Sequence, residues 1–234
     1  MKTIGSTIIM LALASSLFAD NGKELKLASP DGTHEIVFYQ KQVSPAVNEL
    51  CYRVDYKSQP VVNESRAGLE LDNRIWEMAL GVRNLKQPAC WMDNLEVDSV
   101  TYQPETNLTW QPLYGERSSV RDHYRAGTLC LSKKDNSGYR LNIEVRAYNE
   151  GVAFRYFFPE HPKAIFHKVV GDLTEYALPA GTKAWTEQWA QAFFERLNID
   201  DIKHPVERAL TFELPNGKWA ALADADVDDW CLTK

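Results

Sequence analysis

The sequence predicts an all-β fold made of many short strands, arranged as a sandwich or a barrel. Apolar and polar residues alternate along segment after segment, which is the two-residue period of a strand with one buried face. Short runs rich in Gly, Pro, Asn and Asp separate most of these segments and indicate turns. No segment has a long, well-capped helical period. Short strands at this spacing are typical of sandwiches and barrels.

A hairpin over about residues 139–148 and 151–158 is the best-supported single element. The segment Asn149-Glu150-Gly151 between the two strands is a turn signal of the kind that joins antiparallel strands. Apolar residues alternate with polar ones on both sides of it, so each strand should present one face to the core. The apolar positions are Leu141, Ile143, Val145, Ala147, Val152, Phe154, Tyr156 and Phe158.

Further strands are expected along the rest of the chain. Turn residues separate most of them, and no internal repeat, low-complexity linker or clear domain boundary interrupts the chain. A short helix is expected from Thr186 to Leu197. The strand candidates are 24–28, 34–40, 49–56, 67–72, 95–103, 126–133, 165–170, 173–178, 208–214 and 218–224. The turns between them are expected at 29–32, 57–60, 135–138 and 215–217.

The first residues have the layout of a secretory signal peptide. Lys2 precedes an apolar run from Ile8 to Phe18, and Ala19 is followed by a polar stretch. The run is shorter than the roughly 20 apolar residues of a membrane span, although a retained anchor is the alternative. We expect residues 1–19 to be removed, residues 20–234 to form the mature β domain, and the protein to be periplasmic or secreted. No membrane-spanning segment is expected in the mature chain.

The composition favours a folded domain that does not bind nucleic acid. Hydrophobic residues make up 44% of the 234 residues, which is enough for a core, and the formal net charge is −6. Acidic and basic residues are mixed along the chain. Because phosphate binding needs a basic face, nucleic acid is not an expected partner. A neutral ligand such as a sugar is compatible with this charge.

Four cysteines, Cys51, Cys90, Cys130 and Cys231, follow the predicted cleavage point. Export would permit disulfides between them, and four cysteines allow three pairings. Cys51 and Cys130 also fit the alternating pattern as small buried hydrophobic residues. Both interpretations stay open. The wide spacings, with no Cys-x-x-Cys pair, argue against a zinc site.

The densest polar segment is 114–124, with two arginines, two carboxylates and His123. Such a segment can face a ligand or form ion pairs between domains. The charge pattern alone favours an exposed strand edge, where ion pairs contribute about 0–1 kcal/mol each. The sequence contains no Gly-x-Ser-x-Gly, no phosphate-binding glycine loop and no His-Glu-x-x-His motif.

Segment 184–195 concentrates aromatic and carboxylate side chains. Aromatic faces suit the apolar face of a pyranose, and carboxylate oxygens suit calcium. The alternative is a loop whose aromatic residues pack into the core or against a neighbouring domain. The acidic run 224–229 lacks the glycine and terminal glutamate of an EF-hand loop, so an exposed acidic turn is expected there. The large aromatics of 184–195 are Trp185, Trp189, Phe193 and Phe194, and its carboxylates are Glu187 and Glu195.

Two motifs, 114–124 and 146–156, resemble the N-terminal domain of glycoside hydrolase family 97. Segments 29–32, 174–176, 184–185 and 209–214 extend the resemblance, which covers about residue 24 to the end. The resemblance implies a large, two-sheet antiparallel β-sandwich similar to galactose mutarotase. It also implies an exported α-glycosidase that acts on α-glucosides or α-galactosides, with a catalytic barrel that follows this domain. The chain stops within a predicted strand, and we expect it to be a fragment of such an enzyme.

The resemblance also implies a calcium ion beside the substrate, with a glutamate from this domain among its ligands. Glu195 is the first candidate for this ligand and Glu187 the second. Trp185 and Asp224 are the residues that we expect to bind the substrate. Family members usually have Glu where this chain has Asp224, so the shorter side chain suggests a changed substrate contact. Catalytic residues are expected on the barrel, and this chain alone should be inactive.

Two other functions remain open from the sequence. A free-standing carbohydrate-binding or mutarotase-like module would use a His and a carboxylate as acid and base, with His123 or His167 as candidates. A purely structural domain would bind no ligand and would expose an apolar patch where the barrel docks.

Overall fold

The computed structural model describes residues 23–82, 90–135, 137–163 and 166–225. The predicted signal peptide, residues 1–19, lies outside the described residues. Within these ranges no helix has the length and apolar character needed to span a bilayer.

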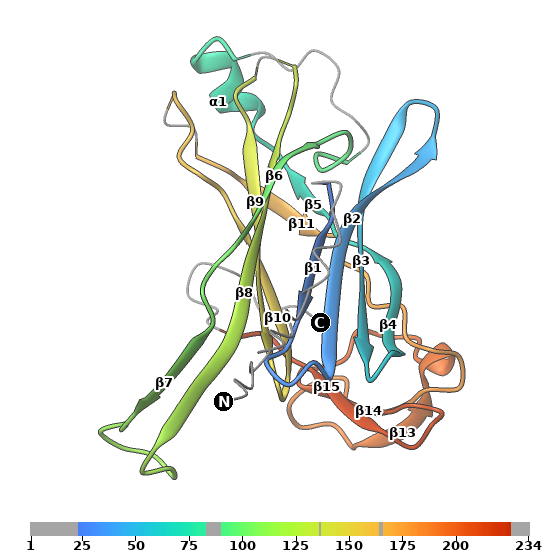
Figure 1. The fold of residues 1–234 in the computed structure, drawn as a ribbon. Helices are drawn as coiled ribbons and strands as arrows, with labels where there is room; N and C mark the ends of the chain where they lie inside the picture. Colours follow the sequence, from blue (N-terminus) through green and yellow to red (C-terminus); the bar gives the residue numbers. More distant parts are fainter. Residues whose placement is uncertain (1–22, 83–89, 136, 164–165, 226–234) are drawn as a thin grey trace, which may run out of the picture.

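The body of the molecule is an antiparallel β-sandwich, as the sequence predicts (Figure 1). One sheet has the order β1-β2-β3-β4, and the other has the order β10-β9-β8-β6, with β7 also paired to β8. The first sheet contains β1 (Leu25–Ala28), β2 (His34–Ser44), β3 (Val47–Tyr56) and β4 (Gln59–Arg66). The second contains β6 (Glu96–Tyr102), β7 (Thr106–Trp110), β8 (Val120–Ser132), β9 (Arg140–Tyr148) and β10 (Gly151–Phe157).

Two smaller sheets complete the fold. Strand β5 (Leu69–Leu71) pairs with β11 (Val169–Asp172). A four-stranded sheet, called the C-terminal sheet below, has the order β13-β12-β14-β15 and lies at the end of the sandwich opposite α1 (Arg74–Ala79) (Figure 1). Its strands are β12 (Lys183–Thr186), β13 (Glu195–Asn198), β14 (Leu210–Glu213) and β15 (Trp219–Leu222), and a short 3-10 turn, η1 (Ile199–Asp201), follows β13.

Side chains from both large sheets form one apolar core. Ile36 and Phe38 from the first sheet and Leu129 and Ile143 from the second are completely buried in it. Phe154 packs its ring edge-on against Phe38, with the ring centroids 5.1 Å apart. Burial of this kind stabilises a fold by roughly 25 cal/mol for each Å² of apolar surface removed from water. The core therefore fixes how the two sheets face each other.

The predicted hairpin is confirmed as β9 and β10. Tyr148 pairs with Gly151, and the register continues to Asn142 opposite Phe157. The apolar positions of β9 are buried, and those of β10 are less exposed than the residues that alternate with them. The two-residue period therefore gave the correct inward face of both strands.

The structure confirms most of the other predicted strands. Segments 24–28, 34–40, 49–56, 67–72, 95–103, 126–133, 208–214 and 218–224 correspond to β1, β2, β3, β5, β6, β8, β14 and β15. Segment 165–170 is strand only from Val169 onward within the described residues. Segment 173–178 is not a regular strand. Its amides bond to the carbonyl oxygens of Arg66 and Gly68 and to the Ser65 side chain, which does not form a continuous ladder.

The predicted turn at 57–60 is shorter than expected, because β4 already begins at Gln59. Lys57 and Ser58 both have positive φ angles, 50° and 60°, and they connect β3 to β4. Two central residues with positive φ define the tight hairpin turn that fits the twist of antiparallel strands. Asn-Gly is the usual signal for this turn, and Lys-Ser gives none. Strands β7, β12 and β13 and helix α1 were also not predicted.

The predicted helix from Thr186 to Leu197 is wrong. Thr186 ends β12, Glu195 begins β13, and these two residues are antiparallel partners. The backbone N–H and C=O groups at both ends of the segment therefore belong to the β12–β13 ladder and not to a helix. Between them the chain makes only a single tight turn, in which the Ala192 amide donates to the Trp189 carbonyl oxygen (2.7 Å).

The described cysteines are buried or half-buried free thiols. Cys51 and Cys90 are buried, Cys130 is partly buried, and none of the three is in a disulfide. Burial raises the pKa of the Cys51 and Cys90 thiols. The interpretation as a small buried hydrophobic residue is confirmed for Cys51, whereas Cys130 is only partly buried. Cys231 lies outside the described residues.

A polar cluster holds α1 against the end of the sandwich. The hydroxyl of the fully buried Tyr139 donates to the Glu77 carboxylate (2.6 Å). Asn73 accepts from the Lys168 amide through Oδ1 (2.9 Å), which turns its NH₂ group toward Nδ1 of His167 (3.2 Å). That contact requires an unprotonated Nδ1. Burial lowers the pKa of His167 to about 4, so the imidazole is neutral at pH 7.

Candidate functional site

The predicted site segment forms β12, β13 and the loop between them. Trp185 pairs with Arg196 and Thr186 with Glu195 across the two strands. Because neighbouring residues in a strand point to opposite faces, Trp185 and Thr186 project from opposite sides of the C-terminal sheet. The loop 187–194 therefore begins at the end of β12, where Trp185 lies on one face of the C-terminal sheet and Thr186 on the other.

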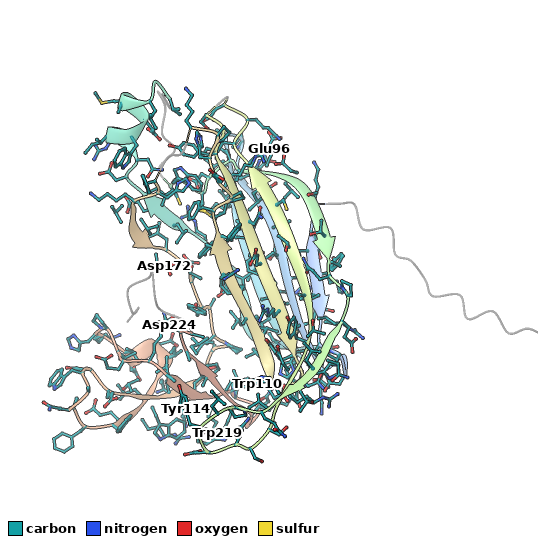
Figure 2. The ribbon with its side chains drawn as sticks, turned by 90° about the vertical axis from the view of Figure 1, so that its left-hand side faces the viewer. Glu96, Trp110, Tyr114, Asp172, Trp219 and Asp224 are labelled. Atoms are coloured by element: carbon teal, nitrogen blue, oxygen red, sulfur yellow. The ribbon has the colours of Figure 1, made fainter. Side chains whose placement is uncertain are left out.

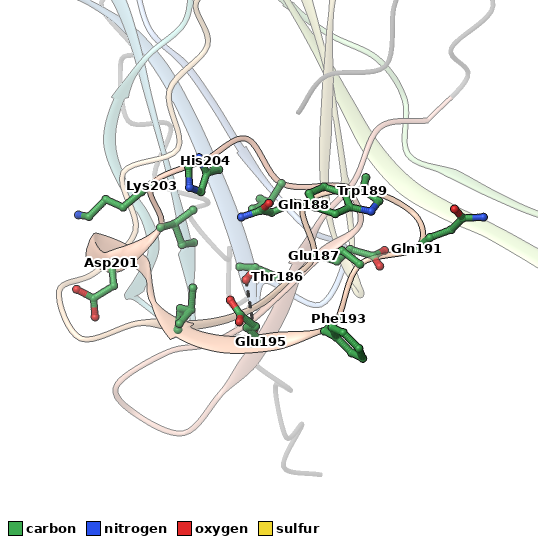
Figure 3. Close-up of a pocket in the computed structure, with 14 residues that line it drawn as sticks. Thr186, Glu187, Gln188, Trp189, Gln191, Phe193, Glu195, Asp201, Lys203 and His204 are labelled. Carbon is green, nitrogen blue, oxygen red and sulfur yellow. Dashed lines mark hydrogen bonds between the residues drawn. The ribbon is translucent and has the colours of Figure 1, made fainter.

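One face of this segment borders a hollow of about 480 Å³ (Figure 3). Glu187 and Glu195 both line it, together with the aromatic residues Trp189 and Phe193. The chain that follows β13 forms the opposite wall, after the turn at Ile199–Asp201. The remaining lining residues are Thr186, Gln188, Gln191, Ala192, Leu197, Asp201, Ile202, Lys203, His204 and Val206. The structure thus brings together the two carboxylates that the sequence singled out.

Neither carboxylate forms a salt bridge with any described residue. Figure 3 shows that their side chains do not point toward each other. In the part of the chain that the structure describes, no three His, Cys, Asp or Glu side chains are close enough to hold a metal ion. Carboxylate oxygens suit calcium, which takes 6–8 oxygen ligands. Glu187 and Glu195 therefore fit a calcium site only as a minority of its ligands.

Trp185 lies on the opposite face of the C-terminal sheet and does not line the hollow. Its ring stacks on Trp219 with the centroids 4.4 Å apart, and the Arg196 guanidinium lies 5.0 Å from its centroid. Arg196 also pairs with Glu213 on the same face. Trp219 remains 58% exposed at the edge of this ladder. The structure thus separates Trp185 from the two glutamates.

Asp224 belongs to a third location, beside the joint between the C-terminal sheet and the sandwich (Figure 2). Its carboxylate accepts a hydrogen bond from the Arg208 guanidinium (2.8 Å), and both side chains are mostly buried. The same guanidinium lies 5.5 Å from the ring centroid of Tyr176. An ion pair of this kind fixes the direction of the carboxylate. The rest of the acidic run, residues 226–229, lies outside the described residues.

Segment 114–124 confirms the exposed-edge interpretation for its first half. In its second half, Arg121 and His123 bond to residues outside the segment. His123 Nε2 contacts the Glu105 carboxylate (2.7 Å), and Arg125 donates to the other Glu105 oxygen (3.0 Å). Arg121 donates to Asn107 (3.1 Å). The sequence did not point to Glu105 because the pairing depends on the register between β7 and β8.

The two histidines considered for acid–base catalysis lie far apart in the fold. His123 is on β8 beside Glu105, whereas His167 contacts Asn73 and stacks on Phe158, with the ring centroids 4.3 Å apart. No carboxylate is among the described hydrogen-bond partners of His167. Only His123 therefore meets the requirement for a paired carboxylate, and neither residue lines the hollow.

Sequence reasoning missed Lys203 and His204, which line the hollow from the far side. Both follow η1, which turns the chain back over β13. The acids Asp200 and Asp201 are helix-start residue types and give a weak signal for such a turn. Nothing in the sequence shows that the turn faces residues 187–194.

A family model described as the N-terminal part of glycosyl hydrolase 97 matches residues 27–234. The chain belongs to this family. The expected family is therefore confirmed, and with it the β-sandwich fold of a glycosyl hydrolase 97 N-terminal domain.

Relatives of this family 97 domain are much longer than the chain. A retaining alpha-galactosidase of Bacteroides thetaiotaomicron is 26% identical over 178 residues, which are 76% of the chain but 22% of that enzyme. A glycoside hydrolase family 97 enzyme from Pseudoalteromonas sp. strain K8, solved in complex with panose, has a TM-score of 0.73 at 24% identity and covers 88% of the chain. The same enzyme was also solved with acarbose.

A solved beta-arabinopyranosidase has a TM-score of 0.68 at 17% identity and covers 87% of the chain. At these identities the solved structures establish a shared fold. The family 97 domain spans 29% of the Pseudoalteromonas enzyme and 32% of the arabinopyranosidase. The chain thus spans less than a third of each relative.

Proposed function

We propose that this chain is the accessory N-terminal domain of an exported, calcium-dependent α-glycosidase that hydrolyses α-glucosides or α-galactosides. It packs against the catalytic barrel and closes one side of the substrate site. The barrel carries the catalytic residues, and the domain alone is inactive. The observation that carries the proposal is the match of the family 97 N-terminal model to residues 27–234, with Glu187 and Glu195 beside one hollow.

The hollow supports a role at the substrate site. It is lined by carboxylate, amide and imidazole groups together with Trp189 and Phe193. Sugar sites combine aromatic surfaces with a few directed polar groups in this way. The hollow is open to solvent, so burial of a sugar needs surfaces from elsewhere in the polypeptide. Relatives that include a retaining alpha-galactosidase and an enzyme solved with panose support an oligosaccharide substrate.

Glu195 is the proposed calcium ligand of this domain, with Glu187 as a second contributor. Both carboxylates are free of salt bridges among the described residues, so ligation would break no internal pair. The bound calcium would help orient the sugar at the barrel. Asp224 is proposed to direct its carboxylate toward the substrate, held in place by Arg208. Trp185 could contact a sugar only on the outer face of the C-terminal sheet, where it stacks on Trp219.

The test begins with the reading frame beyond Lys234 and with the full-length product of the gene. Glu195→Gln should raise the calcium concentration needed for half-maximal hydrolysis of an aryl α-glucoside or α-galactoside by at least roughly tenfold. Glu160→Gln, at an exposed glutamate outside the hollow, should leave it unchanged. Calcium titration into chelator-treated enzyme, followed by calorimetry and by activity, gives both readouts.

A frame that ends at Lys234 would rule out this function. Mutarotation of glucose or galactose by the 234-residue chain, lost in Glu105→Gln, would then favour a mutarotase-like module built on His123. Sequencing the N-terminus of the exported protein tests cleavage after Ala19. Equal calcium requirements for Glu195→Gln and the wild type would remove calcium ligation from this domain.

A further inference from the structure

The strand β7 and the first part of β8 form a two-stranded ribbon that projects from the sandwich (Figure 1). We call residues 106–124 the β7–β8 ribbon. Thr106 pairs with Tyr124 at its base and Trp110 with Val120 near its tip. An isolated two-stranded ribbon is marginally stable in water. The ribbon therefore needs internal contacts or a partner on one of its faces.

The apolar side chains of β8 lie on one side of the strand in its second half and on the other side in the ribbon. In its second half, the core-facing positions are Gly127, Leu129 and Leu131, all buried. The same side of the strand carries Arg121 and His123 within the ribbon. Because side chains alternate strictly, the apolar residues of the ribbon fall on the opposite, outward side. A change of the apolar side along one strand indicates that a different surface covers the outer face there.

Most polar groups on the charged side of the ribbon already have partners, although Nδ1 of His123 has none among the described residues. Glu105 bridges His123 and Arg125, and Arg121 bonds to Asn107. Arg125 also donates to the Ser29 carbonyl oxygen (3.3 Å), which ties the base of the ribbon to the turn after β1. These contacts hold the ribbon in a fixed direction. They leave the outward side as the surface that is open for binding.

Apart from Asp122, which lies opposite Leu108, the large side chains of the outward side are apolar. Leu108 is 63% and Trp110 52% exposed on β7, and Leu113 at the tip is fully exposed. Toward the base, Tyr124 packs on Tyr148, with the ring centroids 5.1 Å apart. Figure 2 shows Trp110 and Tyr114 at the end of the molecule that carries the C-terminal sheet. Large aromatic and aliphatic side chains of this kind form the cores of protein interfaces.

We propose that the outward side of the β7–β8 ribbon docks on the catalytic part of the same enzyme. The inference rests on the proposed function, because the catalytic barrel that would contact the ribbon is part of that proposal. The relatives supply a second argument: the match covers only 22% of the alpha-galactosidase, so most of such an enzyme lies outside this domain and includes the surface that would cover the ribbon. A projecting ribbon does not bury a small sugar, which needs a concave site. A protein surface is therefore the occupant that fits.

Hydrogen exchange tests the docking directly. Amides of residues 106–124 should exchange roughly tenfold more slowly in the full-length enzyme than in the 234-residue chain. Trp110→Asp should abolish that difference in the full-length enzyme. Thr109→Asp, on the charged side of the same strand and opposite Arg121, is the matched control and should keep it. Both variants should leave the unfolding midpoint of the 234-residue chain unchanged, since both side chains are exposed.

Equal exchange of the ribbon in the two forms would overturn the docking and leave the proposed function intact. A concentration-dependent dimer of the 234-residue chain, broken by Trp110→Asp, together with an unprotected ribbon in the full-length enzyme would make a second copy the occupant instead. A reading frame that stops at Lys234 would remove the proposed function and this inference with it.

Discussion

The sandwich and the C-terminal sheet are built from the same antiparallel ladders, but they bury different amounts of apolar surface. In the sandwich, two sheets face each other and enclose a continuous core that runs from Leu25 to Ala147 in sequence. In the C-terminal sheet, the core consists of Ala184, Leu210, Phe212 and Leu214, with partly buried residues around it. The C-terminal sheet therefore buries apolar side chains on only one of its two faces.

The other face of the C-terminal sheet is held by side-chain contacts in water. Arg196, Trp185 and Trp219 form a ladder across the strands, and Arg196 pairs with Glu213. Regions with few buried contacts open locally at lower free energy than the core does. The segment that lines the hollow thus belongs to the less stable of the two regions. A binding loop can adjust to a ligand more easily in such a region.

The largest effect is expected for Phe38→Ala in the sandwich. Phe38 is completely buried between Tyr52 and Phe154, so the substitution should lower the free energy of unfolding by about 3–5 kcal/mol. Urea unfolding followed by far-UV circular dichroism measures the loss. A change below about 1 kcal/mol would contradict the assignment of this residue to the main core.

A smaller and more local effect is expected for Leu210→Ala in the C-terminal sheet. Leu210 is buried against few neighbours, so we expect a loss of about 2 kcal/mol, the low end for Leu→Ala. Hydrogen exchange should accelerate in residues 183–222 and stay unchanged in β8 and β9. Equal acceleration in both regions would show that they unfold as one unit, so the C-terminal sheet would not be a separate, less stable region.

The aromatic ladder should contribute less than either core. A double-mutant cycle with Trp185→Ala and Trp219→Ala should give a coupling free energy of about 0.5–1.5 kcal/mol from the stacked pair. Thermal unfolding of the wild type, the two single variants and the double variant supplies the cycle. Additive effects would mean that the stack does not stabilise the outer face.

An effect confined to acidic pH is expected at His167 in the sandwich. Its pKa is lowered to about 4 in the folded chain from 6.5, so the unfolded chain binds more protons between these values. Its contribution to stability is complete above pH 6.5 and is lost as the pH falls toward 4. His167→Gln should flatten the fall of the urea midpoint between pH 7 and 4.5, whereas His204→Gln, at an exposed histidine, should not. Identical profiles for His167→Gln and the wild type would contradict the prediction.

The sequence was most informative where burial is one-sided and the strands are long. The alternation in 141–147 reports directly on a face that the fold buries, so the hairpin was predicted with its correct inward side. Strand β4 was missed because its turn uses Lys57 and Ser58 rather than Asn-Gly. Strands β12 and β13 flank the segment that was predicted to be a helix, and no Gly or Pro turn signal separates them.

The candidate site was predictable only in part. Glu187 and Glu195 border one hollow because the loop that joins them is short, and neighbours in sequence stay neighbours in space. Trp185 and Asp224 depend on strand register and on the partner Arg208, and no local pattern contains that information. Lys203 and His204 line the opposite wall of the hollow, and their position depends on the path of the chain after η1, which the sequence does not show.

The alternation in β12 restricts which changes of length the region tolerates. Changes of length are easier to accommodate within 188–194, because that part of the loop belongs to no strand ladder. A single residue inserted within Lys183–Thr186 would rotate the strand by one position, turning Trp185 inward and placing a buried threonine in water. Homologous domains should therefore differ in the length of this loop and rarely in the length of the strand before it. Loop grafts between such enzymes should be joined after Thr186 and before Glu195.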